Sequence, residues 1–356
     1  MQRAVAKATN IGGVAAGTIV SGGWHRDRIQ GQLGSAHTPE FADAGVHRGA
    51  SGAVGRRLVP LAVGAGHQVT GMTRFEDKAE GLRARGAEAV VANALDRAAV
   101  VAAVAKARAE VVVHQLTALS SFANLRRFDR EFEATNLLRT QGTTNLIAAA
   151  RAAGARRLVA QSFAGWPYAR SGGPVKTGED ELDPDPPAKF QGTLNAIRYL
   201  ERAVLTAEGL DGVVLRYGAF YGPGTSLGEG GKYLKAVRQR RFPIIGEGAG
   251  VWSFIHIDDV ASATLSAIEH GEAGIYKIVD DEPAPVAEWL PFLASAISAP
   301  PPRHIPAWLG RLLVGEHGLA IMNEVRGASN SKAEREFAWQ PRYASWREGF
   351  REGLAD

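Results

Sequence analysis

The chain is organised around the stretch Gly49-Ala-Ser-Gly52-Ala-Val-Gly55, which runs directly into the apolar-periodic segment Arg56-Arg-Leu-Val-Pro-Leu-Ala-Val63. Three glycines at a spacing of three let the backbone approach a ligand closely, and the helix that follows adds its N–H groups and its dipole. This turn predicts a site for the pyrophosphate of a dinucleotide. Alone it is a weak signal, because a loop that only reverses the chain uses the same residues.

The composition is that of a globular protein. The chain has 356 residues, 45% of them apolar, which suits one large α/β domain or two smaller ones. It has no cysteine, so disulfides and cysteine-ligated zinc are excluded, and we expect a cytoplasmic location. The net charge of +4 comes from basic residues scattered among acidic ones, which predicts a solvated surface and no nucleic-acid partner. Without a run of about 18 uncharged apolar residues, no membrane span is expected.

The first 47 residues do not fit the rest of the sequence. They show no sustained period, and Asp43-Ala-Gly-Val-His-Arg48 stands where a buried strand should lead into the glycine turn. We therefore interpret that strand as missing. We expect residues 1–47 to be a disordered or non-native N-terminal extension, such as out-of-frame sequence, since a frame shifted by one base can encode an apolar strand there. A signal peptide is not supported, because no cleavage site follows.

Strand-like and helix-like segments alternate after the turn. The strand-like segments are 67–73, 87–92, 110–114, 157–161 and 212–217. The helix-like segments are 56–63, 76–85, the one N-capped near Asp96, 130–153 and 190–206. This rhythm predicts a Rossmann-type doubly wound parallel sheet with ligands at the carboxyl ends of its strands. We assign residues 48–220 to this dinucleotide-binding domain and 221–356, where the elements become mixed, to a smaller substrate-capping region.

Five motifs occur in an order typical of one enzyme superfamily. They are Gly49-x-x-Gly52-x-x-Gly55, Asn136 with Gly142-Thr143, Arg216-Tyr217 leading to Tyr221-Gly-Pro-Gly224, Phe254-Ile-His-Ile-Asp258-Asp259-Val, and Lys332 to Trp339-Gln-Pro341. Over roughly residues 48–350 the chain resembles the extended short-chain dehydrogenases/reductases, in their NAD-dependent epimerase/dehydratase branch. The resemblance is specific for fold and cofactor and much less so for the reaction.

The resemblance implies a set of cofactor-binding residues. They are Gly49, Ser51, Gly52, Ala53, Val54 and Gly55 at the pyrophosphate, Asn93, Ala94 and Leu95 beside the adenine, and Leu116, Thr117, Ala118, Asn136, Gln161 and Tyr217 toward the nicotinamide. In the family an acidic residue at the end of the second strand marks NAD, whereas here Thr73 is followed by Arg74. Because an arginine binds a 2′-phosphate bidentately, we expect NADP(H) to be favoured over NAD(H). The alternative is an ordinary exposed arginine at a strand end.

The usual catalytic pair of the family is absent. Its tyrosine and lysine lie four residues apart on one helix, and anchoring that helix on Glu201 puts Thr193 and Ile197 at the two positions. The gap-free match puts the family's serine position on Phe163, one residue after Ser162. We therefore take Ser162 and Tyr168 as the catalytic candidates. The alternative for Tyr168 is an aromatic side chain that packs beneath the following loop.

The substrate side also departs from the sugar-nucleotide enzymes of the family. Trp252 stands where they usually carry an arginine, and tryptophan cannot bind a diphosphate. A small or largely apolar carbonyl or alcohol substrate is therefore expected. Four aromatic residues are predicted to line its pocket, with a place in the core as the alternative: Trp166, Phe190, Tyr221 and Trp252. His256 and Asp258 are interpreted as structural, and no metal site is expected.

These observations favour an NAD(P)-dependent oxidoreductase or epimerase with a non-standard acid/base, either Tyr168 or a water held by Ser162. Two alternatives remain. One is a non-redox isomerase, dehydratase or cyclase on the same fold, and the other is an NADP(H)-sensing binding protein without catalysis. A homodimer that pairs through the helices near 130–153 and 189–206 is expected by analogy with the family.

Overall fold

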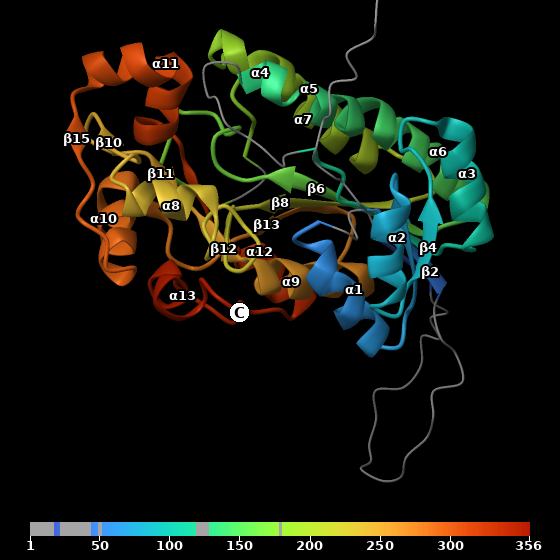
Figure 1. Ribbon diagram of the computed structural model, residues 1–356. Helices are drawn as coiled ribbons and strands as arrows, with labels where there is room; N and C mark the ends of the chain where they lie inside the picture. Colours follow the sequence, from blue (N-terminus) through green and yellow to red (C-terminus); the bar gives the residue numbers. More distant parts are fainter. Residues whose placement is uncertain (1–17, 22–43, 49–51, 119–127, 178–179) are drawn as a thin grey trace, which may run out of the picture.

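A single eight-stranded sheet lies between two layers of helices, with smaller elements at one end (Figure 1). The computed structural model describes residues 18–21, 44–48, 52–118, 128–177 and 180–356. The strand order is β13-β8-β6-β5-β1-β2-β3-β4. The strands are β1 (Thr18–Ser21), β2 (Ala44–Arg48), β3 (Gln68–Thr73), β4 (Glu88–Val91), β5 (Val111–His114), β6 (Arg157–Phe163), β8 (Asp211–Tyr217) and β13 (Gly274–Ile278). All of them except β1 pair in parallel, which confirms the predicted Rossmann-type sheet.

The strand before the glycine turn is present, so the expectation that it is missing was wrong. β2 runs parallel to both of its neighbours, with Ala44 opposite Gln68 of β3 and Val46 opposite Val112 of β5. A segment that lies between two strands can form backbone hydrogen bonds with both of them. Residues 44–48 can therefore form a strand although they contain no apolar run. β1 also pairs antiparallel with β3 and β5. The expectation for residues 1–17 and 22–43 lies outside the described residues.

Two helical layers bury the faces of the sheet (Figure 1). One layer contains α1 (Gly55–Gly64), α2 (Glu76–Arg83), α9 (Ile257–Glu269) and α12 (Ser331–Phe337). The other contains α3 (Arg97–Lys106), α6 (Thr143–Ala153) and α7 (Gln191–Leu205). Successive side chains of β5 point to opposite faces of the sheet and so pack with both helical layers. Val111 and Val113 pack with α1 and α9, whereas Val112 packs with α3 and α6. Each fully buried valine stabilises the fold by about 1.5–3 kcal/mol.

The segment predicted as one helix over 130–153 is divided into several pieces. It contains α4 (Phe128–Glu131), α5 (Glu133–Leu137), the π-helix η2 (Leu138–Gly142) and α6. Two threonine hydroxyls donate back into this segment, from Thr140 to the Asn136 carbonyl at 2.8 Å and from Thr143 to the Arg139 carbonyl at 2.6 Å. Such bonds distort a regular helix, and single π-turns are frequent at functional sites.

The C-terminal part, assigned from the sequence to a substrate-capping region, does not form a separate unit. Its own elements are β9 (Ala219–Tyr221), β10 (Ile244–Ile245), β11 (Val251–Trp252), β12 (Phe254–His256), β14 (Ala284–Pro285), β15 (His304–Ile305) and β16 (Gly327–Ala328), with α8 (Lys232–Arg238), α10 (Val286–Ala296), α11 (Ala307–Asn323) and α13 (Trp346–Glu352). They pack around the buried Trp289 and Trp346. However, β13 and α9 return to the main sheet and its helical layer, so this half completes the dinucleotide-binding fold.

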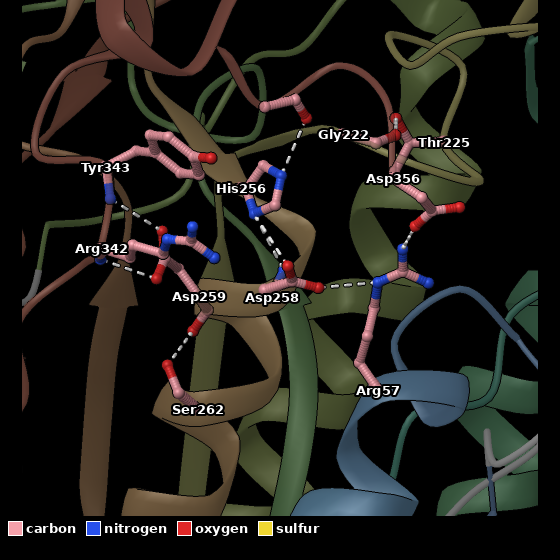
Figure 2. Close-up of polar contacts among 11 residues, drawn as sticks. Arg57, Gly222, Thr225, His256, Asp258, Asp259, Ser262, Arg342, Tyr343 and Asp356 are labelled. Atoms are coloured by element: carbon pink, nitrogen blue, oxygen red, sulfur yellow. Dashed lines mark hydrogen bonds and ion pairs between the residues drawn. The ribbon is translucent and has the colours of Figure 1, made fainter.

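Polar contacts at the start of α9 link it to α1 and to the C-terminal residues of the chain (Figure 2). Arg57 of α1 bonds Asp258 at 2.8 Å and Asp356 at 3.2 Å. His256 lies 2.9 Å from the Gly353 carbonyl and accepts a hydrogen bond from the Asp258 amide. His256 and Asp258 therefore have the structural roles expected from the sequence.

Candidate active site

The beginning of α1 fits the pyrophosphate of a dinucleotide. In the described part of the chain, no side chain caps this helix and no acidic residue lies in its first turn, so its N–H groups and dipole are available to an anion. Gly52 and Ala53 are half-buried, and Val54 anchors the turn in the core with 6% of its surface exposed. Gly49 and Ser51 lie outside the described residues.

The ends of β3 and β4 hold the residues predicted for the adenosine half. Thr73 is buried, and Arg74 after it is exposed, with its guanidinium 5.4 Å from the centre of the Phe75 ring. Asn93 is exposed, and its side chain accepts a hydrogen bond from the Leu95 amide at 3.1 Å, which shapes the turn after β4. The residue that follows β3 is therefore an exposed arginine, as the sequence reads, and not a carboxylate.

The segment after β5 lies between the sheet and the helices. Leu116 is buried, Thr117 and Ala118 are half-buried, and the Ala118 amide donates to the Thr135 hydroxyl at 3.0 Å. Ala94 belongs to the same core as Leu116. The cofactor-binding role that the resemblance implies for this segment stays a prediction.

Tyr217 is a core residue, contrary to its assignment to the cofactor. Its side chain is 1% exposed, its hydroxyl lies 2.7 Å from the Thr264 hydroxyl of α9, and it accepts a hydrogen bond from Gln115 at 3.2 Å. Burial raises the pKa of Tyr217 above its ordinary value. Because both contacts are internal, the hydroxyl stabilises the packing of α9 on the sheet.

Ser162 is held by a buried ion pair. Its hydroxyl donates to Glu201 of α7 at 2.6 Å, and Arg216 of β8 binds the same carboxylate bidentately at 2.9 and 2.8 Å. All three side chains are almost completely buried. Burial lowers the pKa of Arg216, but the hydrogen bonds and the charge of Glu201 outweigh it and raise that pKa. The Ser162 oxygen is thereby fixed at the carboxyl end of β6. Gln161, next to it in β6, is half-buried.

Tyr168 lies inside a buried cluster of charges. Its ring is 1% exposed and stands 5.3 Å from the Arg216 guanidinium and 5.6 Å from the Lys277 ammonium, which pairs with Asp180 at 2.6 Å. Burial raises the pKa of Tyr168, and the neighbouring Arg216 opposes this only in part. This environment corresponds to the packing role that the sequence left as the alternative.

The beginning of α7 holds Thr193 and, one turn later, Ile197, the two positions that the sequence aligned with the family's tyrosine and lysine. Thr193 donates to Asp129 of α4 at 2.6 Å, and the same carboxylate accepts the backbone amides of Gly192 at 3.1 Å and Thr193 at 2.9 Å. Asn136 donates to the Thr193 hydroxyl at 3.1 Å, while its own amide oxygen is buried without a described partner. Ile197 is a core residue with 1% exposure. Asp129 therefore caps α7 and fixes Thr193, a contact for which the sequence gave no local signal.

Only two of the four predicted pocket aromatics come together near this site. The rings of Trp166 and Phe190 lie 4.8 Å apart, Ile321 of α11 packs against the same cluster, and all three line a small cavity. Tyr221 and Trp252 belong instead to the hydrophobic core of the C-terminal part. Their assignment to the pocket was therefore wrong, because an aromatic side chain in a sequence looks the same in a core and in a pocket.

Neither a metal cluster nor a membrane-spanning helix occurs among the described residues. No group of three histidine, aspartate or glutamate side chains there has the arrangement of a metal site. No helix in the described part of the chain is long and apolar enough to cross a membrane.

The parallel sheet, the open start of α1 and the residues at the strand ends define a Rossmann-type enzyme that depends on a nicotinamide dinucleotide. Residues 48–279 match the NAD dependent epimerase/dehydratase family, and the chain belongs to that family. The protein is accordingly an NAD(P)-dependent enzyme of the oxidoreductase or epimerase type, as the sequence predicted.

Two characterised relatives are reductases by name. The chain is 44% identical over 304 residues to the 3-diazoavenalumate denitrifying reductase of a Streptomyces species, covering 85% of this chain and 97% of the relative. It is 29% identical over 248 residues to the 4-hydroxy-2-methyl-3-oxo-4-farnesyl-3,4-dihydroquinoline-1-oxide ketoreductase of Stigmatella aurantiaca, covering 69% and 70%.

Solved structures share the fold at low sequence identity. The UDP-glucose 4-epimerase of Thermotoga maritima superimposes with a TM-score of 0.65 at 21% identity, covering 86% of this chain and 96% of that one. The UDP-glucose 4-epimerase of Thermus thermophilus, solved with NAD, gives a TM-score of 0.63 at 21% identity, with the same coverage.

Proposed function

We propose that this protein is an NADP(H)-dependent reductase of a small diazo carboxylate, in which hydrogen replaces the diazo group and dinitrogen leaves. The observation that carries the proposal is the polar arrangement at the beginning of α7. There the Thr193 hydroxyl donates a hydrogen bond to Asp129, and the buried Ile197 is the residue that we align with the family's lysine. The relative at 44% identity, named as a denitrifying reductase of 3-diazoavenalumate, supplies the substrate class.

Carbonyl reduction creates an alkoxide and therefore needs a proton donor beside the substrate oxygen. A threonine hydroxyl that is directed at a carboxylate cannot donate to that oxygen at the same time, and a neutral hydroxyl is a poor acid. A diazonium group needs no such donor, because a diazonium cation and one hydride give the hydrogen-substituted product and dinitrogen. When bound, the reduced nicotinamide supplies that hydride. The missing tyrosine and lysine are therefore compatible with turnover of this substrate class.

The side chains around the site suit a cationic, planar reacting group. The Asp129 carboxylate lies beside Thr193 and favours positive over negative charge at that point. The half-buried Trp166, which packs on the buried Phe190 ring, offers aromatic surface on which a conjugated body can stack. Ser162, fixed by Glu201, supplies an oxygen at the end of β6 that can orient the substrate or hold a water molecule.

The test is turnover of 3-diazoavenalumate with NADPH, followed by mass spectrometry of nitrogen-labelled dinitrogen and by the loss of the reduced-nicotinamide absorbance. We expect equal amounts of dinitrogen released and NADPH consumed, with the hydrogen of a deuterated NADPH found in the product. A reaction without NADPH controls for spontaneous loss of nitrogen. Release of dinitrogen that NADPH does not accelerate would overturn the proposal.

A second candidate, reduction of a small apolar carbonyl, is favoured by the position of Ser162 at the end of β6 and by the relative named as a ketoreductase. In that case a water held by Ser162 supplies the proton. Three results together would favour carbonyl reduction. The protein would consume NADPH with a panel of ketones, Ser162→Ala would lose this activity, and the diazo substrate would release no dinitrogen.

A further inference from the structure

Arg139 is a buried cation that no described residue neutralises. It lies in the π-helix η2 with 7% of its surface exposed. Its guanidinium makes no hydrogen bond or ion pair with any described residue, and its Nη1 atom is closed off from solvent. Burying a charged group without a partner is costly, so such a residue needs an explanation.

The side chain packs beside an aromatic ring and is reached by the charge of Glu201, the carboxylate that holds Ser162. Its guanidinium is 5.8 Å from the centre of the Phe132 ring, and Phe132 belongs to the same cluster as Phe190 and Trp166. Burial lowers the pKa of Arg139 to about 10, and the nearby charge of Glu201 opposes this only in part. The packing of η2 against α7 fixes this position.

The one charged side chain that acts on Arg139 already has a partner. Glu201 is engaged bidentately by Arg216 at 2.9 and 2.8 Å. Arg139 therefore has no anion of its own among the described side chains. An unbalanced guanidinium beside an aromatic wall is suited to a planar oxyanion, because its donors match both oxygens of a carboxylate.

We propose that Arg139 binds the carboxylate of the substrate and thereby sets the enzyme's preference for small planar carboxylic acids. The inference rests on the proposed function for the chemical class of the substrate. A phosphate of the dinucleotide is the other source of an oxyanion. The predicted pyrophosphate turn opens α1, which lies in the helical layer opposite to that of α6 and α7, and this arrangement favours the substrate (Figure 1).

The test measures binding by isothermal titration calorimetry, with 4-hydroxycinnamate as the probe and its neutral amide as the comparison. In the wild type, with NADP(H) present, we expect the acid to bind more tightly than the amide. Arg139→Met is expected to raise the Kd of the acid about 10- to 100-fold and to leave that of the amide unchanged. Arg139→Lys should lie between the two. Arg202→Met removes an exposed arginine of α7 as a matched control and should change neither Kd.

The thermal stability of Arg139→Met distinguishes a carboxylate-binding role of Arg139 from a purely structural one. Arg139→Met removes an uncompensated buried charge, so the protein without ligand should unfold at the same or a higher temperature. A fall in the unfolding temperature with unchanged binding of the acid would overturn the proposal. Equal binding of acid and amide by the wild type would overturn it too, and weakened NADPH binding in Arg139→Met would assign the guanidinium to the cofactor. None of these readouts requires turnover, so the inference and the proposed reaction can fail separately.

Discussion

Glu201 is the side chain on which the candidate site most depends, because it holds both Ser162 and Arg216. We expect Glu201→Gln to lower the free energy of unfolding by about 3–5 kcal/mol, since it leaves the buried Arg216 without a counter-ion. Urea denaturation measures the change. Combining it with Arg216→Met should restore part of the loss. A change below about 1 kcal/mol would show that the ion pair is not formed.

Tyr168 provides the second prediction at the scale of residues. Its ring is buried between two cations in a packing role, so Tyr168→Phe should retain both turnover and stability. Removing the hydroxyl while keeping the ring should change the free energy of unfolding by about 1 kcal/mol or less. The kcat and the unfolding midpoint are the measurements. If Tyr168→Phe still folds and binds NADPH but has lost turnover, the prediction is wrong and the Tyr168 phenol is the catalytic acid.

At the scale of elements, α7 depends on a cap that comes from α4. Asp129 accepts the backbone amides of Gly192 and Thr193, which otherwise have no intrahelical partner. Asp129→Ala should therefore destabilise the protein by about 0.5–2 kcal/mol, and it should also free the hydroxyl of Thr193. Asp129→Asn, which keeps an acceptor, should recover part of the stability. Equal stability of Asp129→Ala and the wild type would contradict the assignment.

The elements also show which local signals the sequence carried. Asp96 caps α3 as expected, because its side chain accepts the amide three residues later in the same segment. The cap of α7 was not predictable, since Asp129 and Thr193 are 64 residues apart. The π-turn that buries Arg139 escaped prediction for a related reason. The spacing of apolar residues does not distinguish it from a regular helix.

At the scale of the whole molecule, binding of the cofactor should raise the free energy of unfolding. A ligand at one hundred times its Kd raises the free energy of unfolding by about 2.7 kcal/mol. NADPH should therefore raise the melting temperature more than NADH at equal concentration, because we expect the exposed Arg74 after β3 to bind a 2′-phosphate. Arg74→Asp should abolish the difference, and Lys78→Ala on the neighbouring helix serves as a control. A wild type that responds equally to both would reject the NADP(H) preference.

The sequence by itself determined the alternation of strands and helices, the parallel sheet, the glycine turn and the family, because these depend on local pattern and on motifs in order. Tertiary structure decided the rest. Residues 44–48 form a strand only because β3 and β5 flank it. Tyr217, Tyr221 and Trp252 are core residues because of what packs on them, while Arg139 meets Glu201 through the packing of η2 on α7. Burial and charge balance arise between distant segments, so no local pattern reports them.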